Sequence, residues 1–232
     1  MNQNAKEKIQ TLSETHLLDL EKASLIKARE SWHIFGIMSE FVSAAEQLAN
    51  IRPAVSIFGS ARTKPDNPYY QKTEELALML SNAGFSVISG GGPGIMEAAN
   101  RGASEVGAKN VGLNIALPHE QSGNPYVTPS LSFKFHYFAL RKMHFMMRAK
   151  AMVAFPGGFG TLDELFECLT LVQTRKANPI PIILFGTEYW KRLLNLDVLV
   201  EEGAISAQDL NLFKYADDPQ QAWDLIQAFF KT

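Results

Sequence analysis

The stretch that decides the fold is Ala151-Met152-Val153-Ala154-Phe155-Pro156-Gly157-Gly158-Phe159-Gly160-Thr161-Leu162-Asp163-Glu164. An apolar run comes first, a glycine-rich segment follows it, and an amphipathic segment begins at Leu165. This order predicts a strand, a glycine turn and a helix. Glycines let a ligand approach the main chain closely, and the first N–H groups of a helix have no partner within it. The turn is therefore predicted to bind a phosphate, through Gly157, Gly158, Gly160 and Thr161.

A second glycine turn has the same setting. Phe85 to Ser89 is a β-rich run, and Gly90-Gly91-Gly92-Pro93-Gly94 leads into a helical pattern. Two such turns indicate a parallel sheet whose ligand crevice lies beyond the carboxyl ends of its strands. Neither turn is the G-x-G-x-x-G fingerprint, and the chain has no G-x-x-x-x-G-K-[ST] motif. We expect a phosphate-bearing ligand that is neither an ordinary dinucleotide nor a hydrolysed triphosphate, with part of it against Gly90, Gly91 and Gly92.

Two further groups of residues are candidates for the same crevice. Gly59 and Ser60 leave the first predicted strand, so Ser60 and Arg62 are candidate ligand contacts, the alternative being ordinary turn chemistry and a solvated arginine. Glu97 lies one turn into the second glycine helix, where it can reach a ligand in the crevice. Its alternative is an i,i+4 ion pair with Arg101.

The pattern along the chain predicts an α/β fold with a mostly parallel sheet flanked by helices. The expected strands are 54–58, 85–89, 111–117, 151–155 and 181–184. The expected helices are 68–83, 95–106, 138–150, 161–175, 188–201 and a closing helix from 219 to 230. A polar loop is expected over 119–132. Residues 1–50 have apolar side chains near helical spacing and are predicted to be an N-terminal extension of two helices, with 51–232 as the α/β domain.

Composition excludes several classes of partner. The 232 residues carry 22 basic and 24 acidic side chains, a net charge of -2, which gives no global attraction to nucleic acid or to an anionic membrane. The single cysteine, Cys168, fits a reducing compartment and is interpreted as a small buried residue. The polar start resembles no signal peptide, and the apolar runs are too short to span a bilayer. We expect a cytoplasmic protein without nucleic-acid or membrane partners.

The helix predicted over 138–150 is unusually basic. Its cationic side chains are Arg141, Lys142, Arg148 and Lys150. A solvated cationic face is the simple explanation. Because this helix leads into the strand that ends at the glycine turn, however, its cations can lie near a bound phosphate and Glu164. The five histidines have no metal-ligand spacing, so no metal and no cofactor are inferred.

Taken together, these motifs resemble the LONELY GUY family of nucleoside 5'-monophosphate phosphoribohydrolases, long misnamed lysine decarboxylases. The resemblance rests on Ser89–Ala98, on Arg141-Lys142-Met143 and on Pro156–Glu164, and it covers roughly Ala54 to Phe230. Shorter members usually lack the 50-residue extension.

The resemblance implies an activity and a catalytic pair. In that family an arginine and the last glutamate of the PGGxGTxxE motif are catalytic, and they correspond to Arg141 and Glu164, with Lys142 beside them. The implied reaction is hydrolysis of the N-glycosidic bond of a nucleoside 5'-monophosphate, such as a cytokinin riboside monophosphate or an AMP-like nucleotide, to free base and ribose 5-phosphate. The resemblance also implies that 51–232 is a Rossmann-like, nucleotide-binding catalytic domain, in a homodimer or higher homo-oligomer with the site near the subunit interface.

Three alternatives remain open from the sequence. The first is a non-catalytic nucleotide-binding or carrier protein that uses the same crevice. The second is lysine decarboxylation, which would need a Schiff-base lysine and a partner for the pyridinium nitrogen of the cofactor. This constellation is not evident in the sequence. A single-stranded nucleic-acid surface over residues 133–150 is the third, and the acidic net charge argues against it.

Overall fold

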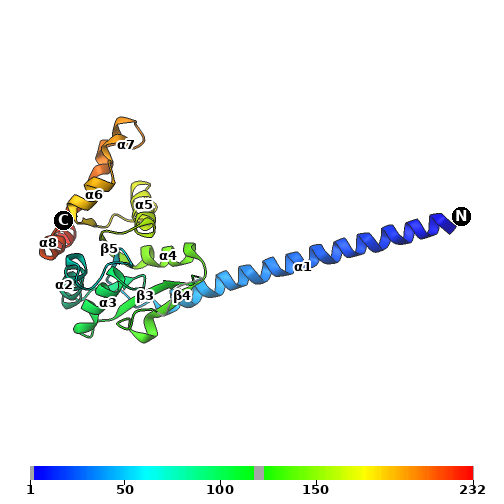
Figure 1. The fold of residues 1–232 in the computed structure, drawn as a ribbon, viewed down its shortest axis with the longest axis horizontal. Helices are drawn as coiled ribbons and strands as arrows, with labels where there is room; N and C mark the ends of the chain where they lie inside the picture. Colours follow the sequence, from blue (N-terminus) through cyan, green and yellow to red (C-terminus); the bar gives the residue numbers. More distant parts are fainter. Residues whose placement is uncertain (1–2, 118–122, 232) are drawn as a thin grey trace. The chain divides into compact units, whose positions relative to one another are not determined.

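The computed structural model describes residues 3–117 and 123–231, with the side chains of the first helix described at Asp19 and from Lys22 onward. By its internal contacts the chain divides into two compact units, 1–43 and 44–232. Helix α1 (Gln3–Gln47) is one uninterrupted helix (Figure 1). The prediction of two helices within residues 1–50 is therefore wrong. A lone glycine, Gly36, and the absence of proline before Pro53 give the sequence nothing that ends a helix there.

The core of the second unit is a seven-stranded sheet. Its strands are β1 (Ala54–Phe58), β2 (Ser86–Ser89), β3 (Asn110–Ile115), β4 (Ser132–Phe135), β5 (Ala149–Ala154), β6 (Ile182–Phe185) and β7 (Phe213–Ala216). They lie in the order β4-β3-β2-β1-β5-β6-β7, and every neighbouring pair is parallel. The predicted α/β fold with a parallel sheet is confirmed. The strand order reverses between β1 and β5, which is where ligands bind in open sheets of this kind.

The structure differs from the sequence prediction at the two edges of the sheet. The sequence pattern does not predict β4 or β7, because each contains an exposed lysine, Lys134 or Lys214, and so lacks the continuous apolar run that marks the equally short β6. The predicted loop 119–132 begins within 118–122, outside the described residues, and its later part contains a 3-10 turn at Pro129–Leu131. The predicted helix 188–201 is two helices, α6 (Thr187–Leu193) and α7 (Asp197–Glu201), and extended backbone at Leu194 separates them.

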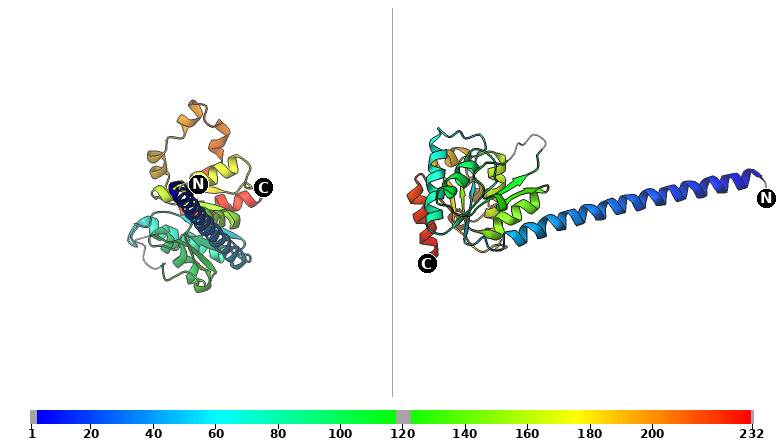
Figure 2. Two further views of the ribbon diagram at one scale, coloured as in Figure 1. Left: turned by 90° about the vertical axis from the view of Figure 1, so that its right-hand side faces the viewer. Right: turned by 90° about the horizontal axis from the view of Figure 1, so that it is seen from below.

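Helices cover both faces of the sheet. α2 (Pro68–Asn82), α3 (Ile95–Glu105) and α8 (Pro219–Lys231) lie on one face of the sheet (Figure 2). Their apolar side chains join those of β1, β2, β5, β6 and β7 in one buried cluster. α4 (Phe138–Arg148) contacts β1 from the other face, with the rings of Phe145 and Phe58 4.6 Å apart. α5 (Phe159–Gln173) follows β5. The parallel strands therefore direct their carboxyl ends, and the loops that follow them, to one edge.

The main chain of Ser60 joins three of these loops. Its N–H donates to the carbonyl of Pro156 at 3.0 Å, and its carbonyl accepts from the N–H of Ile95 at 3.0 Å. Gly94 approaches the Ser60 carbonyl so closely, with φ of 68°, that a side chain there would collide with it. The loops after β1, β2 and β5 are thus held in register by backbone hydrogen bonds.

A buried polar network fixes the glycine turn after β2. Asn100 is fully buried; its Oδ1 accepts from Ser89 Oγ at 2.6 Å and from Asn124 Nδ2 at 2.9 Å, while its Nδ2 donates to Asn110 Oδ1 at 3.1 Å. Ser89 Oγ accepts in turn from the N–H of Gly91 at 3.0 Å. A serine and three asparagines thus fix the main chain of the turn.

We predict that Asn100→Ala lowers the free energy of unfolding by about 2–3 kcal/mol, because buried partners lose their hydrogen bonds. Urea denaturation measures the change. The control is Gln220→Ala on exposed α8, which should shift stability by less than about 0.5 kcal/mol. Equal stability of the two variants would show that the network contributes little.

Candidate active site

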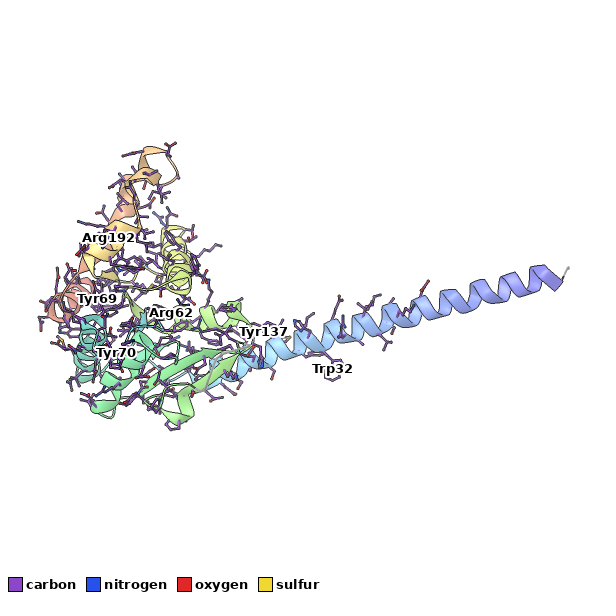
Figure 3. All side chains as sticks on the ribbon, in the orientation of Figure 1. Trp32, Arg62, Tyr69, Tyr70, Tyr137 and Arg192 are labelled. Carbon is purple, nitrogen blue, oxygen red and sulfur yellow. The ribbon has the colours of Figure 1, made fainter. Side chains whose placement is uncertain are left out.

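A hollow of about 590 Å³ opens at the carboxyl ends of β1 and β5. It is lined by Phe58, Gly59, Ser60, Ala61, Arg62, Gly90, Met96, Arg141, Gly157, Gly158, Phe159, Gly160, Thr161, Leu162, Glu164, Tyr189 and Leu193. Most of the predicted site residues are in this set. Arg62, labelled in Figure 3, lies in the loop after β1, and its N–H donates to Ser60 Oγ at 3.1 Å. The hollow is therefore built from loops that are distant in the sequence.

The glycine turn after β5 supplies one wall of this hollow. α5 begins directly after Gly158, which has no side chain to cap the first N–H groups of the helix. A Cβ atom added to Gly158 or Gly160 would meet no atom within 4 Å, so the space beside them is open. Tyr189 fixes the turn from α6, because its hydroxyl donates to the Gly157 carbonyl at 2.6 Å. The turn is thus a rigid, uncapped helix N-terminus that faces open space and suits an anion.

Arg141 and Glu164 face each other in the hollow. Arg141 Nη1 lies 3.6 Å from Glu164 Oε1. The arginine is positioned by its own contacts, since its Nε donates to the Leu113 carbonyl at 2.6 Å and its guanidinium lies 5.2 Å from the centre of the Phe145 ring. Gly90 matters here because a Cβ at that position would lie 2.6 Å from Arg141 Nη2. The two glycine turns and α4 therefore bring this pair together.

Glu164 has an unusual environment for a carboxylate. Only 6% of the residue is exposed. Burial raises the pKa of Glu164 to about 7, although the positive charges of Arg141 and Lys142 act in the opposite direction. A carboxyl group with such a pKa exchanges a proton near neutral pH, as a general acid or base must.

Lys142 lies beside the hollow rather than in its lining. Its Nζ is 2.7 Å from Asp163 Oδ2 and 2.9 Å from Glu167 Oε2. Burial alone would lower the pKa of Lys142, but these two carboxylates outweigh it and raise the pKa. Lys142 is therefore a charged group that fixes α4 to the first turns of α5.

Three other predicted site residues also lie outside the lining described here. The carbonyls of Gly91 and Gly92 accept hydrogen bonds from Asn124, at 2.8 and 3.0 Å. Glu97 Oε1 accepts from the Tyr70 hydroxyl at 2.8 Å (Tyr70 is labelled in Figure 3). Arg101, its alternative partner, pairs with Glu74 at 3.1 Å. The turn after β2 thus reaches the hollow mainly through Gly90.

Sequence reasoning missed several lining residues. Met96, Phe159, Tyr189 and Leu193 line the hollow. Phe159 is 92% exposed and stands at the start of α5, so it offers a flat apolar face to a ligand. Its place inside the glycine motif was a usable signal. Tyr189 and Leu193 gave none, because only the neighbouring position of β6 in the sheet brings α6 to this edge.

The remaining candidates for chemistry are the cysteine and the possible metal ligands. Cys168 is fully buried, and burial raises the pKa of its thiol to about 12. Its burial agrees with the interpretation of Cys168 from the sequence as a small buried residue. Among the described residues, no three His, Cys, Asp or Glu side chains gather as metal ligands. Within the same residues, no helix combines the length and apolar character needed to cross a bilayer.

The fold and the hollow define a Rossmann-like α/β protein with a crevice at its topological switch point. Residues 96–226 match the model of the family described as "Possible lysine decarboxylase". The chain belongs to this family, which includes the LONELY GUY proteins.

Curated relatives carry a more specific name. A probable cytokinin riboside 5'-monophosphate phosphoribohydrolase from Oryza sativa is 33% identical over 136 residues, which is 57% of each chain. A cytokinin riboside 5'-monophosphate phosphoribohydrolase from Arabidopsis thaliana is 27% identical over 172 residues, covering 72% of this chain and 78% of the relative. The chain spans only 57–66% of the length of three rice relatives that it matches.

Solved structures share the fold. The molybdenum cofactor binding protein from Rippkaea orientalis has a TM-score of 0.56 and 21% identity, covering 77% of this chain and 97% of that protein. The molybdenum cofactor carrier protein from Chlamydomonas reinhardtii has a TM-score of 0.55 and 20% identity, covering 78% and 99%. At this identity the likeness concerns the fold alone.

We predict that Glu164→Gln stabilises the protein at pH 8. Below the ordinary pKa of 4.5 the carboxyl is protonated in both the folded and the unfolded state. Between pH 4.5 and about 7 the unfolded chain ionises first, so stability falls as pH rises, and above about 7 the full penalty is present. The glutamine should therefore raise the free energy of unfolding at pH 8 by up to about 3 kcal/mol.

Thermal denaturation at pH 5 and pH 8 measures this effect. The stabilisation should shrink as the pH approaches 5. The exposed Glu201→Gln is the control and should show no such pH-dependent gain. A Glu164→Gln variant that is less stable than the parent at pH 8 would mean that the carboxylate is stabilising.

Proposed function

We propose that this protein hydrolyses the N-glycosidic bond of a nucleoside 5'-monophosphate and releases free base and ribose 5-phosphate. The observation that carries the proposal is the Arg141–Glu164 pair, 3.6 Å apart in a hollow whose other wall is an uncapped helix N-terminus. Family membership and the names of the curated relatives support the same reaction. By analogy with those relatives, a cytokinin riboside 5'-monophosphate is the first substrate to test, and an AMP-like nucleotide the second.

The residue types suit this chemistry. Departure of the base builds positive, oxocarbenium-like charge on the ribose, which an ionised carboxylate stabilises while it orients or deprotonates a water molecule. Glu164 takes this role, and a pKa of about 7 lets it accept a proton at neutral pH. Arg141 cannot act as a base, but its planar fork of donors can hold phosphate or sugar oxygens and keep Glu164 charged.

The glycine turn is proposed to receive the 5'-phosphate. N–H groups at the start of α5, near Gly158, Gly160 and Thr161, have no acceptor within the helix and lie at the positive end of its dipole. The proposed ribose lies between this turn and Gly90, and Phe159 offers a face for the base. Gly59 and Ser60 complete the wall after β1. Lys142, Gly91, Gly92 and Glu97 contribute indirectly, by holding the elements that carry the lining.

Lysine decarboxylation is disfavoured by the state of Lys142. A Schiff-base lysine must be able to lose its proton and reach the substrate. Lys142 is held by two carboxylates that raise its pKa, and it lies outside the lining of the hollow. The remaining alternative is a nucleotide-binding or carrier protein that uses the crevice without hydrolysis.

We expect Glu164→Gln to lower kcat about 10²–10⁴-fold, the usual contribution of a general base. Nucleotide binding should be largely retained, because Arg141 and the glycine turn are intact. Base release from a panel of nucleoside monophosphates, followed by chromatography, measures turnover, and calorimetry measures Kd. The control is Glu201→Gln, which changes an exposed carboxylate outside the lining and should retain most turnover. Binding without base release by the parent protein would favour the carrier alternative.

Gly158→Ala tests the phosphate position separately. The backbone at Gly158 has φ of -90° and ψ of -154°, which an alanine tolerates, and its Cβ would meet no protein atom. The variant should therefore fold normally while its methyl group occupies space beside the helix N-terminus. We expect Kd for the nucleotide to rise at least about tenfold, the effect of about 1.4 kcal/mol. An unchanged Kd would place the phosphate elsewhere.

The other features implied by the resemblance are part of the proposal. We propose a cytoplasmic homodimer or higher homo-oligomer with the site near the subunit interface, no nucleic-acid partner, and a functional division at residues 1–50 and 51–232. Phe159 and Phe166 on α5 are exposed, which is consistent with an interface near the hollow. Sedimentation analysis of the full chain measures the oligomeric state.

A further inference from the structure

A second hollow, of about 660 Å³, lies at the ends of α4 and α5 that are remote from the crevice. We call it the cationic hollow, and its positive side chains are Arg52, Arg148, Lys150, Arg175 and Lys176. Glu167 is the single acidic side chain among the described lining residues, and its carboxylate is already 2.9 Å from Lys142 Nζ. In a chain with a net charge of -2, such a concentration of positive charge does not follow from composition.

Arg148 is the buried member of this set. Only 7% of it is exposed, and its Nη2 donates to the Ala45 carbonyl at 3.0 Å. Among the residues that the structure describes, Arg148 Nε has no hydrogen-bond partner. Burial and the nearby charge of Arg52 both lower the pKa of Arg148. A buried guanidinium with an unused donor and a second cation beside it is unfavourable unless an anion binds there.

Arg175 is the strained member. It follows α5 with φ of 59°, and the next two N–H groups, of Lys176 and Ala177, donate to the Leu171 carbonyl at 2.9 and 3.0 Å. Glycine is the usual residue at such a helix end, because other side chains are disfavoured at positive φ. An arginine at this position places a long cationic side chain at the hollow in spite of the backbone strain.

We propose that the cationic hollow binds a small molecule that carries two or more phosphates. Guanidinium groups match phosphate oxygens with paired hydrogen bonds, and a hollow of this size suits a small ligand. Met143, Met146 and Phe230 provide an apolar side for a base or another apolar part of the same molecule. This site goes beyond the proposed function, because it is a separate hollow with its own cations.

The test is calorimetric titration of the full chain with inorganic tripolyphosphate and with ATP, which share a chain of three phosphates. Each titration is run without and with saturating ribose 5-phosphate, which is included to occupy the crevice. We expect both probes to bind, with an affinity that falls as salt is added. Tighter binding of ATP would show that the apolar side takes part, and equal binding would assign the site to the phosphates alone.

Arg175→Gly is the decisive variant. It removes one cation and at the same time relieves the positive φ, so the protein should be no less stable than its parent. We expect the affinity for tripolyphosphate to fall at least about tenfold. Arg148→Gln should weaken tripolyphosphate binding further. If this substitution of a buried residue prevents folding, the affinity of Arg175→Gly alone tests the proposed site. The exposed Lys109→Gln is the matched control and should leave the affinity unchanged.

Several results would overturn the site. Absence of tripolyphosphate binding, or equal affinity of Arg175→Gly and its parent, would exclude it. Loss of binding when ribose 5-phosphate is added would assign the anion to the crevice. Selective binding of an oligothymidylate that Arg175→Gly weakens would indicate a nucleic-acid surface instead, and salt-sensitive self-association lost in Arg175→Gly would indicate a second copy of the chain. Base release by Arg175→Gly tests the proposed function independently, since the crevice is unaltered.

Discussion

The architecture of the crevice depends on two backbone hydrogen bonds made by one residue. Ser60 donates to Pro156 and accepts from Ile95, and these contacts join the loops after β1, β5 and β2. Backbone groups do not change rotamer, so the loops keep a fixed spacing whatever the side chains do. The shape of the hollow is consequently set by the main chain of the parallel sheet and of the loops at its switch point. The side chains of Arg141 and Glu164 then line a hollow whose position the backbone has fixed.

In this hollow, burial and the neighbouring positive charges act on the pKa of Glu164 in opposite directions. Burial raises the pKa of the Glu164 carboxyl, whereas the positive charges of Arg141 and Lys142 lower it. A pKa of about 7 for Glu164 therefore depends both on its burial and on the positive charges beside it. Lys142 contributes from outside the lining because Asp163 and Glu167 hold it beside α5. The first two turns of α5 therefore carry the reactive carboxyl and the anchors that control its surroundings.

The fold was largely readable from the sequence, and the site partly. The glycine turns and the apolar runs before them predicted β1, β2, β5 and the crevice, because both signals are local. The edge strands β4 and β7 are missed because a lysine interrupts the apolar run in each, whereas β6 is equally short but wholly apolar. The N-terminal helix α1 is predicted as two helices although no helix breaker is present. Glu97 illustrates the limit at the site, because its contact with Tyr70 depends on how α2 packs against α3. Residues contributed by α6 could not be found before the strand order was known.

The buried position of Cys168 has a practical consequence. It is the only sulfhydryl in the chain, and it is enclosed by the core with a proton that it releases only in strongly alkaline solution. Maleimides and similar reagents should therefore leave the native protein unmodified. A cysteine introduced on the surface would then be a unique attachment point for a fluorophore or spin label, without any need to remove the natural one.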